Sequence, residues 1–135
     1  MAFALCLNAC KDEHLVGFDL LPENAKNIIN EHFDKDDILL VNVEKEALVT
    51  EYEVKFKDGT EIDFDKDGNL KKIDCQQKQV PDALIPEAVL EYVKANYPSS
   101  FITEWGRDDL RWKAELDNGL ELLFNRNYQF VGIDD

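Results

Sequence analysis

The 135-residue chain is poor in metal-ligating and basic side chains. It has two histidines and three cysteines, which is too few for most zinc and haem architectures. Its 15 lysines and arginines are outnumbered by 29 acids, so the formal net charge is −14. Nucleic acid and anionic lipid headgroups would be repelled by such a chain. No apolar run reaches the roughly 18 residues that a membrane-spanning helix needs.

Recognisable catalytic motifs are also missing. The sequence contains no G-x-S-x-G, no H-E-x-x-H, no P-loop and no glycine-rich dinucleotide loop. Chance pairs of carboxylates abound among 29 acids, and nothing marks one pair as a general acid and base. A content of 44% hydrophobic and 33% charged residues is typical of a globular domain. We therefore expect a folded protein that is not an enzyme.

The first ten residues predict an export signal. Residues 2–7 are all apolar, and a sharp change to charged residues follows Cys10. The segment Leu7-Asn8-Ala9-Cys10 resembles a bacterial lipobox, in which the cysteine is lipidated and becomes the mature N-terminus. This pattern predicts a signal or lipobox segment at 1–10 and a lipid anchor on Cys10. It places the protein in the periplasm or on the cell surface of a Gram-negative bacterium. The alternative is a frayed apolar N-terminus.

The remainder of the chain repeats itself, in halves that span 15–80 and 81–135. Leu21-Pro22-Glu23 matches Ile85-Pro86-Glu87 at an offset of 64 residues. Further along, the offset is 60 residues. The pairs matched at this second offset include Asp58-Gly59 with Asn118-Gly119, Ile62 with Leu122, Phe64 with Phe124, Leu70 with Phe130, and Ile73-Asp74 with Ile133-Asp134.

Each half is predicted to be one helix followed by four strands. Pro22 and Pro86 suit the first turn of a helix, where the missing N–H costs nothing. Apolar residues recur at helical spacing after each proline, and residues 52–57 alternate apolar and charged side chains as a half-buried strand does. Asp58-Gly59 and Asn118-Gly119 are strong hairpin signals.

A single half would have a thin core, because units of this size are marginal on their own. We therefore expect the two repeats to form one domain together, an α+β fold with one antiparallel sheet of about eight strands and both helices on one face. The other face should be solvated, concave because broad sheets twist, and acidic. Its predicted residues are Glu51, Glu53, Lys55, Lys57, Glu61, Asp63, Asp65, Arg111, Lys113, Glu115, Asp117, Glu121, Leu123 and Asn125.

Two tandem helix–hairpin copies, with [IL]-P-E opening each helix and (D/N)-G at the central turn, resemble the PepSY-like family of exported bacterial proteins. That family is related in fold to the β-lactamase inhibitor protein. The resemblance covers about 15–135 and implies an eight-stranded α+β sheet, export and no known enzymatic activity. It does not carry inhibition over to this chain, because no inhibitor contact can be matched residue by residue.

Calcium is the one cofactor that the sequence suggests. The stretch from Asp63 to Asp74 follows the calcium-loop pattern D-x-D-x-[DN]-G, and calcium takes several oxygen ligands held by a turning loop. The predicted ligands are Asp63, Asp65, Asp67, Asn69 and Asp74. The alternative is a plain β-hairpin with its turn at Asp67-Gly68, and flanking strands in place of helices favour that alternative. The second copy has Leu123, Asn125 and Asn127 at the positions of Asp63, Asp65 and Asp67.

A partner-binding surface is the most favoured function. Interface anchors are often Trp, Tyr and Arg, and Trp105 lies in a stretch predicted to be irregular and exposed, whereas Trp112 is expected in the core. The predicted contact residues are Glu51, Glu53, Trp105, Arg107 and Arg111. The partner would be a protein or a cationic ligand. A calcium-regulated periplasmic protein and an enzyme inhibitor are the alternatives.

Overall fold

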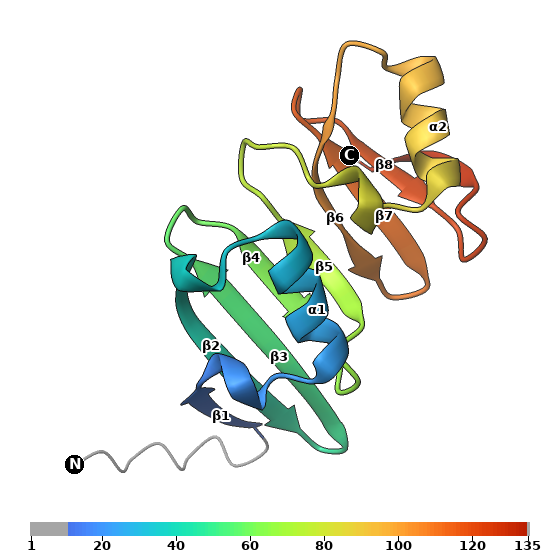
Figure 1. Cartoon of the computed structure of the whole chain (residues 1–135). Helices are drawn as coiled ribbons and strands as arrows, with labels where there is room; N and C mark the ends of the chain where they lie inside the picture. The colour runs from blue at the N-terminus through green and yellow to red at the C-terminus, as the bar shows by residue number, and fades with distance from the viewer. Residues whose placement is uncertain (1–10, 135) are drawn as a thin grey trace. The chain divides into compact units, whose positions relative to one another are not determined.

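The computed structural model describes residues 11–134, which form nine β-strands and two α-helices (Figure 1). The chain divides into two compact units, of which the first ends at Leu70 and the second begins at Lys71. Strands are antiparallel and hydrogen-bond to their neighbours in chain order within each unit. The predicted α+β class with antiparallel strands is confirmed. The number of strands is nine, because an unpredicted strand precedes the first repeat.

The first unit contains four strands and one α-helix. In chain order its elements are β1 (Lys11–Val16), α1 (Glu23–His32), β2 (Ile38–Glu46), β3 (Val49–Phe56) and β4 (Glu61–Phe64). The unpredicted strand β1 pairs with β2, from Lys11 opposite Glu46 to Val16 opposite Val41. Short 3₁₀ turns at Phe18–Leu20 and Lys35–Asp37 lead into α1 and β2.

The second unit contains five strands and one α-helix. Its elements are β5 (Leu70–Asp74), α2 (Glu87–Asn96), β6 (Ile102–Asp108), β7 (Arg111–Leu116), β8 (Glu121–Phe124) and β9 (Phe130–Asp134). A 3₁₀ turn at Asp82–Leu84 precedes α2. Strand β5 is the last strand of the first sequence repeat, and it pairs with β6 from Lys72 to Asp74. The compact units therefore divide the chain about ten residues before the repeats do.

Both helices begin directly after their prolines, as the sequence predicts. Pro22 and Pro86 occupy the N-cap positions of α1 and α2, and Glu23 and Glu87 follow in the first turn, near the positive end of the helix dipole. One face of each helix is buried, through Ala25 and Ile29 in α1 and through Val89 and Val93 in α2. In the second unit, Tyr92 of α2 stacks on Phe130 of β9, with ring centroids 4.5 Å apart.

Four turns, two in each repeat, share one backbone design with a three-residue loop. In each three-residue loop, the third residue has a positive φ and donates its N–H to the carbonyl three residues earlier, as in Gly59 to Phe56 and Gly119 to Leu116. The two predicted hairpin turns are thereby confirmed. Gly68 and Tyr128 occupy the equivalent position in the later turn of each repeat, with φ of 84° and 62°. A tyrosine in this left-handed region is unusual.

The glycine at 68 also allows the helix of the first unit to approach the turn closely. A Cβ on Gly68 would lie 2.8 Å from the Ala25 nitrogen and 2.8 Å from Pro22 Cβ. The Asn24 side chain donates a hydrogen bond to the Asp67 carbonyl at 3.2 Å in the same contact. In the second unit the equivalent Tyr128 turns its ring toward Trp112 instead, with ring centroids 5.8 Å apart.

Three residues are placed differently from their prediction. Trp112 was expected in the core, but it is half-buried. Trp105 was expected to be exposed, but it lies in β6 and is 2% exposed, stacked on Trp112 with ring centroids 5.0 Å apart. A register irregularity between Ile102 and Glu104 shifts the alternation, so both Ile102 and Trp105 are buried. Leu123 was expected to be solvated and is 6% exposed. It lies opposite Lys113, whose ammonium reaches Asp134 on β9, so the lysine stem crosses β8 and covers it.

The close approach at Gly68 yields a matched stability test. Gly68→Ala should cost more free energy of unfolding than Gly119→Ala in urea denaturation. Both glycines have positive φ, and that strain costs about 1–2 kcal/mol at either site. Only the Cβ at position 68 meets backbone, because nothing lies within 4 Å of a Cβ at 119, and overpacking adds about 1–3 kcal/mol. Equal losses for the two variants would contradict the described helix–turn contact.

Candidate functional site: an acidic row in the second unit

Five carboxylates lie in one line across the strands of the second unit. The strand registers place each of these acids directly opposite the next one. We call this set the acidic row, and its members in strand order are Asp74, Glu104, Glu115, Glu121 and Asp134. Opposite residues on neighbouring antiparallel strands have their side chains on the same face at about 5 Å separation, where like charges destabilise the sheet. The backbone thus holds together groups that repel one another.

Two lysines offset part of this charge. Lys72 Nζ lies 3.1 Å from Glu104 Oε2, and Lys113 Nζ lies 3.5 Å from Glu121 Oε1 and 3.4 Å from Asp134 Oδ2. Glu115, in the middle of the row, has no cation within ion-pair distance among the residues that the structure describes. Its only neighbours opposite in the registers are Glu104 and Glu121.

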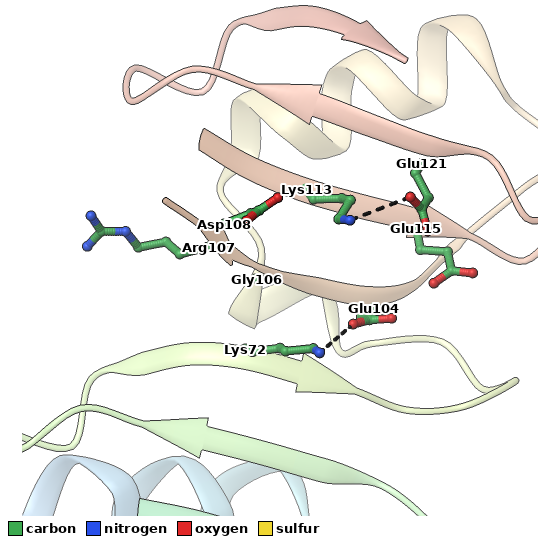
Figure 2. Close-up of a pocket in the computed structure, with 8 residues that line it drawn as sticks. All are labelled: Lys72, Glu104, Gly106, Arg107, Asp108, Lys113, Glu115 and Glu121. Atoms are coloured by element: carbon green, nitrogen blue, oxygen red, sulfur yellow. Dashed lines mark hydrogen bonds and ion pairs between the residues drawn. The ribbon is translucent and has the colours of Figure 1, made fainter. Parts of the chain in front are cut away.

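The middle of the acidic row lines a groove of about 270 Å³ (Figure 2). The lining residues are Lys72, Glu104, Gly106, Arg107, Asp108, Lys113, Glu115 and Glu121. Figure 2 shows that the Arg107 side chain extends away from the carboxylates. Its guanidinium instead lies 5.9 Å from the ring centroid of Trp112. The groove is therefore lined by carboxylates whose charge is only partly compensated.

The repulsion contributes to a raised pKa at Glu115, the central acid of the row. Partial burial raises the pKa of Glu115, and a hydrogen bond with Glu104 together with the negative charges of Glu104, Glu121 and Asp74 raises it further. A carboxyl in this position retains a proton more readily than an isolated glutamate. A positive charge entering the groove would relieve the same repulsion.

The first repeat lacks this arrangement. Lys55 occupies the position equivalent to Glu115, and it lies opposite Glu61 as Glu115 lies opposite Glu121. The same backbone frame therefore carries a complementary pair in one repeat and a repelling pair in the other. Opposed acids also occur in the first unit, where Glu44 lies opposite Glu51 and Glu53 lies opposite Asp63.

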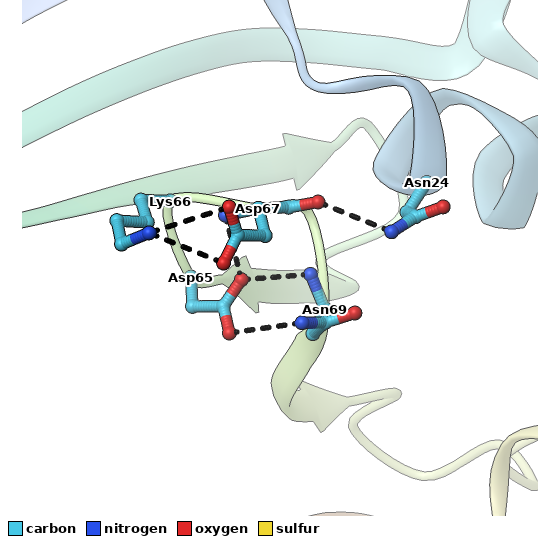
Figure 3. Close-up of polar contacts among 5 residues, drawn as sticks. All are labelled: Asn24, Asp65, Lys66, Asp67 and Asn69. Atoms are coloured by element: carbon cyan, nitrogen blue, oxygen red, sulfur yellow. Dashed lines mark hydrogen bonds and ion pairs between the residues drawn. The ribbon is translucent and has the colours of Figure 1, made fainter.

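The predicted calcium ligands contribute to a hairpin turn (Figure 3). Asp65 Oδ1 accepts hydrogen bonds from the backbone N–H groups of Asp67 and Asn69, each at 2.9 Å. Asp65 Oδ2 accepts from the Asn69 side-chain amide at 3.3 Å. Burial works to raise the pKa of Asp65, but these hydrogen bonds outweigh it and hold the pKa below its ordinary value. The Asp67 carboxylate faces Lys66 at 3.3 Å.

A neutral residue performs the same structural role in the second repeat. Asn125 Oδ1 accepts from the backbone N–H groups of Asn127 and Gln129, at 2.9 and 3.0 Å. The turn therefore needs an acceptor at this position and does not need its charge. Asp74 accepts a hydrogen bond from the Gln76 N–H in the following turn. Within residues 11–134, no group of three or more His, Cys, Asp or Glu side chains is arranged to hold a metal ion.

The predicted partner contacts lie in both units. Glu51 and Glu53 are half-buried on β3 of the first unit. Arg107 and Arg111 are exposed on either side of the turn between β6 and β7, whereas Trp105 is buried in β6. Cys10, the predicted lipidation site, lies outside the described residues. None of the described helices is long and apolar enough to cross a membrane.

Sequence reasoning found two members of the acidic row, Glu115 and Glu121, as part of the solvated face. It missed Glu104, because the irregularity in β6 hides the alternation of that strand. The sequence analysis predicted Asp74 to be a calcium ligand and assigned no site role to Asp134. The matched Ile-Asp pairs at 73–74 and 133–134 were the available signal, because each places an acid beside an isoleucine at the same strand position.

Comparison with known proteins identifies the family. A family model described as "Putative beta-lactamase-inhibitor-like, PepSY-like" matches residues 7–54 and again 50–132. The two matches support the tandem repeat. The chain belongs to this PepSY-like family, as the resemblance predicted. Among curated proteins, none matches the chain.

Solved structures from two Bacteroides species are similar over 92% of this chain. A "putative calcium-regulated periplasmic protein" from Bacteroides thetaiotaomicron is 34% identical over 98% of its own length, with a TM-score of 0.84. Two periplasmic proteins from Bacteroides vulgatus, both described as putative, are 29% and 32% identical over 98% and 100% of their lengths, with TM-scores of 0.87 and 0.84. Neither the family nor these three structures indicates an enzyme.

The acidic row predicts a pH-dependent stability effect at Glu115. Glu115→Gln should raise the free energy of unfolding at neutral pH by about 0.2–1 kcal/mol, because it removes one repelling charge. The pKa of Glu115 is raised in the folded state, so the native protein takes up a proton there before the unfolded chain does. The advantage of the variant should therefore shrink as pH falls through that raised pKa toward the ordinary value of 4.5.

Chemical denaturation across this pH range measures the effect. Glu91→Gln on the exposed surface of α2 is the control, because it removes the same charge away from the row. An advantage for Glu115→Gln that is absent, or that does not diminish at low pH, would contradict the described repulsion.

Proposed function

We propose that the protein is an exported, non-enzymatic binding module of the bacterial periplasm that holds a cationic partner protein on its acidic strand faces. The observation that carries the proposal is the uncompensated Glu115 in a groove between Glu104 and Glu121. A sheet that keeps repelling acids in register loses stability by doing so. Such a cost is expected where a surface serves binding, since exposed charges can easily be arranged in complementary pairs, as at Lys55 and Glu61.

Charge complementarity explains why the partner would be cationic. A lysine or arginine side chain placed in the groove would meet Glu104, Glu115 and Glu121 together. The net charge of −14 would also steer a basic partner toward the protein at low ionic strength. The periplasmic location of the three similar structures supports export, and the opposed acids Glu53 and Asp63 offer a second such surface on the first unit.

One substitution tests this function and introduces only a side-chain pair that the fold already accommodates in its first repeat. Glu115→Lys recreates the Lys–Glu pair that the first repeat already carries at Lys55 and Glu61. The immobilised full chain should capture partners from a periplasmic extract, and the variant should lose them. Glu91→Lys is the matched control, since it makes the same charge change on the exposed surface of α2. Capture should also weaken as salt is raised. Identical capture by both variants would contradict the proposal.

Calcium-dependent behaviour is the second candidate function. The calcium-regulated description of the similar Bacteroides thetaiotaomicron protein favours it, together with the acids Asp63, Asp65 and Asp67 at one turn. Asp65 and Asp67 retain acceptor positions that calcium could use, since calcium takes carboxylate and carbonyl oxygens. Binding to the folded form alone would stabilise it by about 2.7 kcal/mol at a hundredfold excess over Kd.

Asp65→Asn separates calcium binding from turn formation. Asparagine keeps the acceptor that the turn needs, as Asn125 does in the second repeat, but it removes a charged ligand. This candidate predicts that calcium raises the Tm of the unmodified chain relative to chelator, and that Asp65→Asn abolishes the rise with little change in chelator. Asn127→Ala at the second turn is the control. Equal Tm values with calcium and with chelator reject the candidate.

A further inference from the structure

Among the strands that the structure describes, none lies beside the outer edge of β9. On its other side, β9 pairs with β8. Two of its large apolar side chains are exposed, Val131 at 52% and Ile133 at 46%. Unpaired backbone groups beside exposed apolar side chains form a template for another strand.

The repeat shows what covers this edge when it is filled. Strand β5 is the equivalent of β9, and its corresponding edge pairs with β6. Ile73, the equivalent of Ile133, lies opposite the buried Trp105 and is 0% exposed, against 46% for Ile133. The difference arises from the missing neighbour, because the two residues occupy the same position in matching strands. An antiparallel strand with a large apolar side chain opposite Ile133 would bury Ile133 and remove this difference in exposure.

The charges near the outer edge of β9 indicate which kind of strand could bind there. In the filled case Asp74 lies opposite Glu104, and Lys72 on the same strand neutralises that glutamate. In β9 the position of Lys72 is taken by Gly132, which provides no cation, and nothing lies within 4 Å of where its Cβ would be. Lys113 pairs with Asp134 but is shared with Glu121, so the charge of Asp134 is only partly compensated and favours a positive charge opposite it on an added strand.

We propose that the β9 edge binds an extended basic segment of the partner by strand addition, with an apolar residue opposite Ile133 and a lysine or arginine opposite Asp134. This inference rests on the proposed function and specifies how the cationic partner attaches. Backbone hydrogen bonds would supply affinity, and the two side-chain positions would supply specificity. A second copy of this chain is disfavoured as the occupant, since each copy carries a charge of −14 and its own β9 lacks a basic residue.

A peptide taken from the chain itself serves as the probe. Residues 102–108 already form the strand that covers the equivalent edge of β5, and Glu104→Lys in this peptide supplies the basic residue opposite Asp134. Added to the full chain, the peptide should slow amide hydrogen exchange in β9. The peptide with the original Glu104 should bind more weakly, because it would place a like charge opposite Asp134.

Matched variants decide the outcome. Ile133→Lys should weaken peptide binding about tenfold, the loss expected when burial of one isoleucine is removed. Leu110→Lys is the control, because Leu110 is 69% exposed at the β6–β7 turn, away from the edge. Ile133→Thr keeps a β-branched residue in the strand and should give a smaller loss if the lysine variant unfolds. Absent protection of β9, or equal affinity for Ile133→Lys and the unmodified chain, overturns the proposal.

Two further outcomes separate this proposal from its alternatives. Sedimentation equilibrium that shows a dimer lost in Ile133→Lys but kept in Leu110→Lys would assign the edge to a second copy and overturn the basic-segment proposal. If Glu115→Lys abolishes partner capture while Ile133→Lys does not, the acidic groove binds the partner and the edge does not. The proposed function would then stand and the strand-addition proposal would fail.

Discussion

Backbone hydrogen bonding between the strands of the second unit forces carboxylates together that would otherwise move apart. The registers that align Glu104, Glu115 and Glu121 on one face are the same registers that bury Trp105 and Leu122 on the other. Because side chains alternate along a strand, slipping the register to separate the acids would expose the core. Repulsion on one face is therefore maintained by apolar burial on the opposite face. It can be relieved by lysines, by a proton or by a cationic ligand.

The tandem repeat presents this frame with two different surfaces. The turn acceptor is charged at Asp65 and neutral at Asn125, which separates the structural need for an acceptor from any role of the charge. The cross-strand position that carries Lys55 in the first repeat carries Glu115 in the second. Comparing equivalent positions thus distinguishes what the fold requires from what one repeat has acquired. Features present in only one repeat are the best candidates for function.

Local chemistry made much of the fold predictable. Pro22 and Pro86 marked the helix starts, and Asp58-Gly59 marked a hairpin, because these residues restrict or permit particular backbone angles. Trp105 was misplaced because Gly106 and Arg107 beside it suggested an irregular stretch, whereas both residues continue β6, whose register irregularity lies earlier, between Ile102 and Glu104. The acidic row was only partly predictable for a related reason. Its alignment depends on pairing between distant strands, which composition and periodicity along one strand do not specify.

The most direct test of the account is the titration of individual carboxyl groups by ¹³C NMR of the intact chain. The account predicts that the Glu115 carboxyl titrates above the ordinary glutamate value of 4.5, because Glu104, Glu121 and Asp74 share its face. Glu121→Gln should lower the titration midpoint of Glu115 relative to the unmodified chain, because the substitution removes one of the negative charges that raise its pKa. A Glu115 carboxyl that titrates at or below 4.5, and that does not respond to Glu121→Gln, would contradict the alignment of the row.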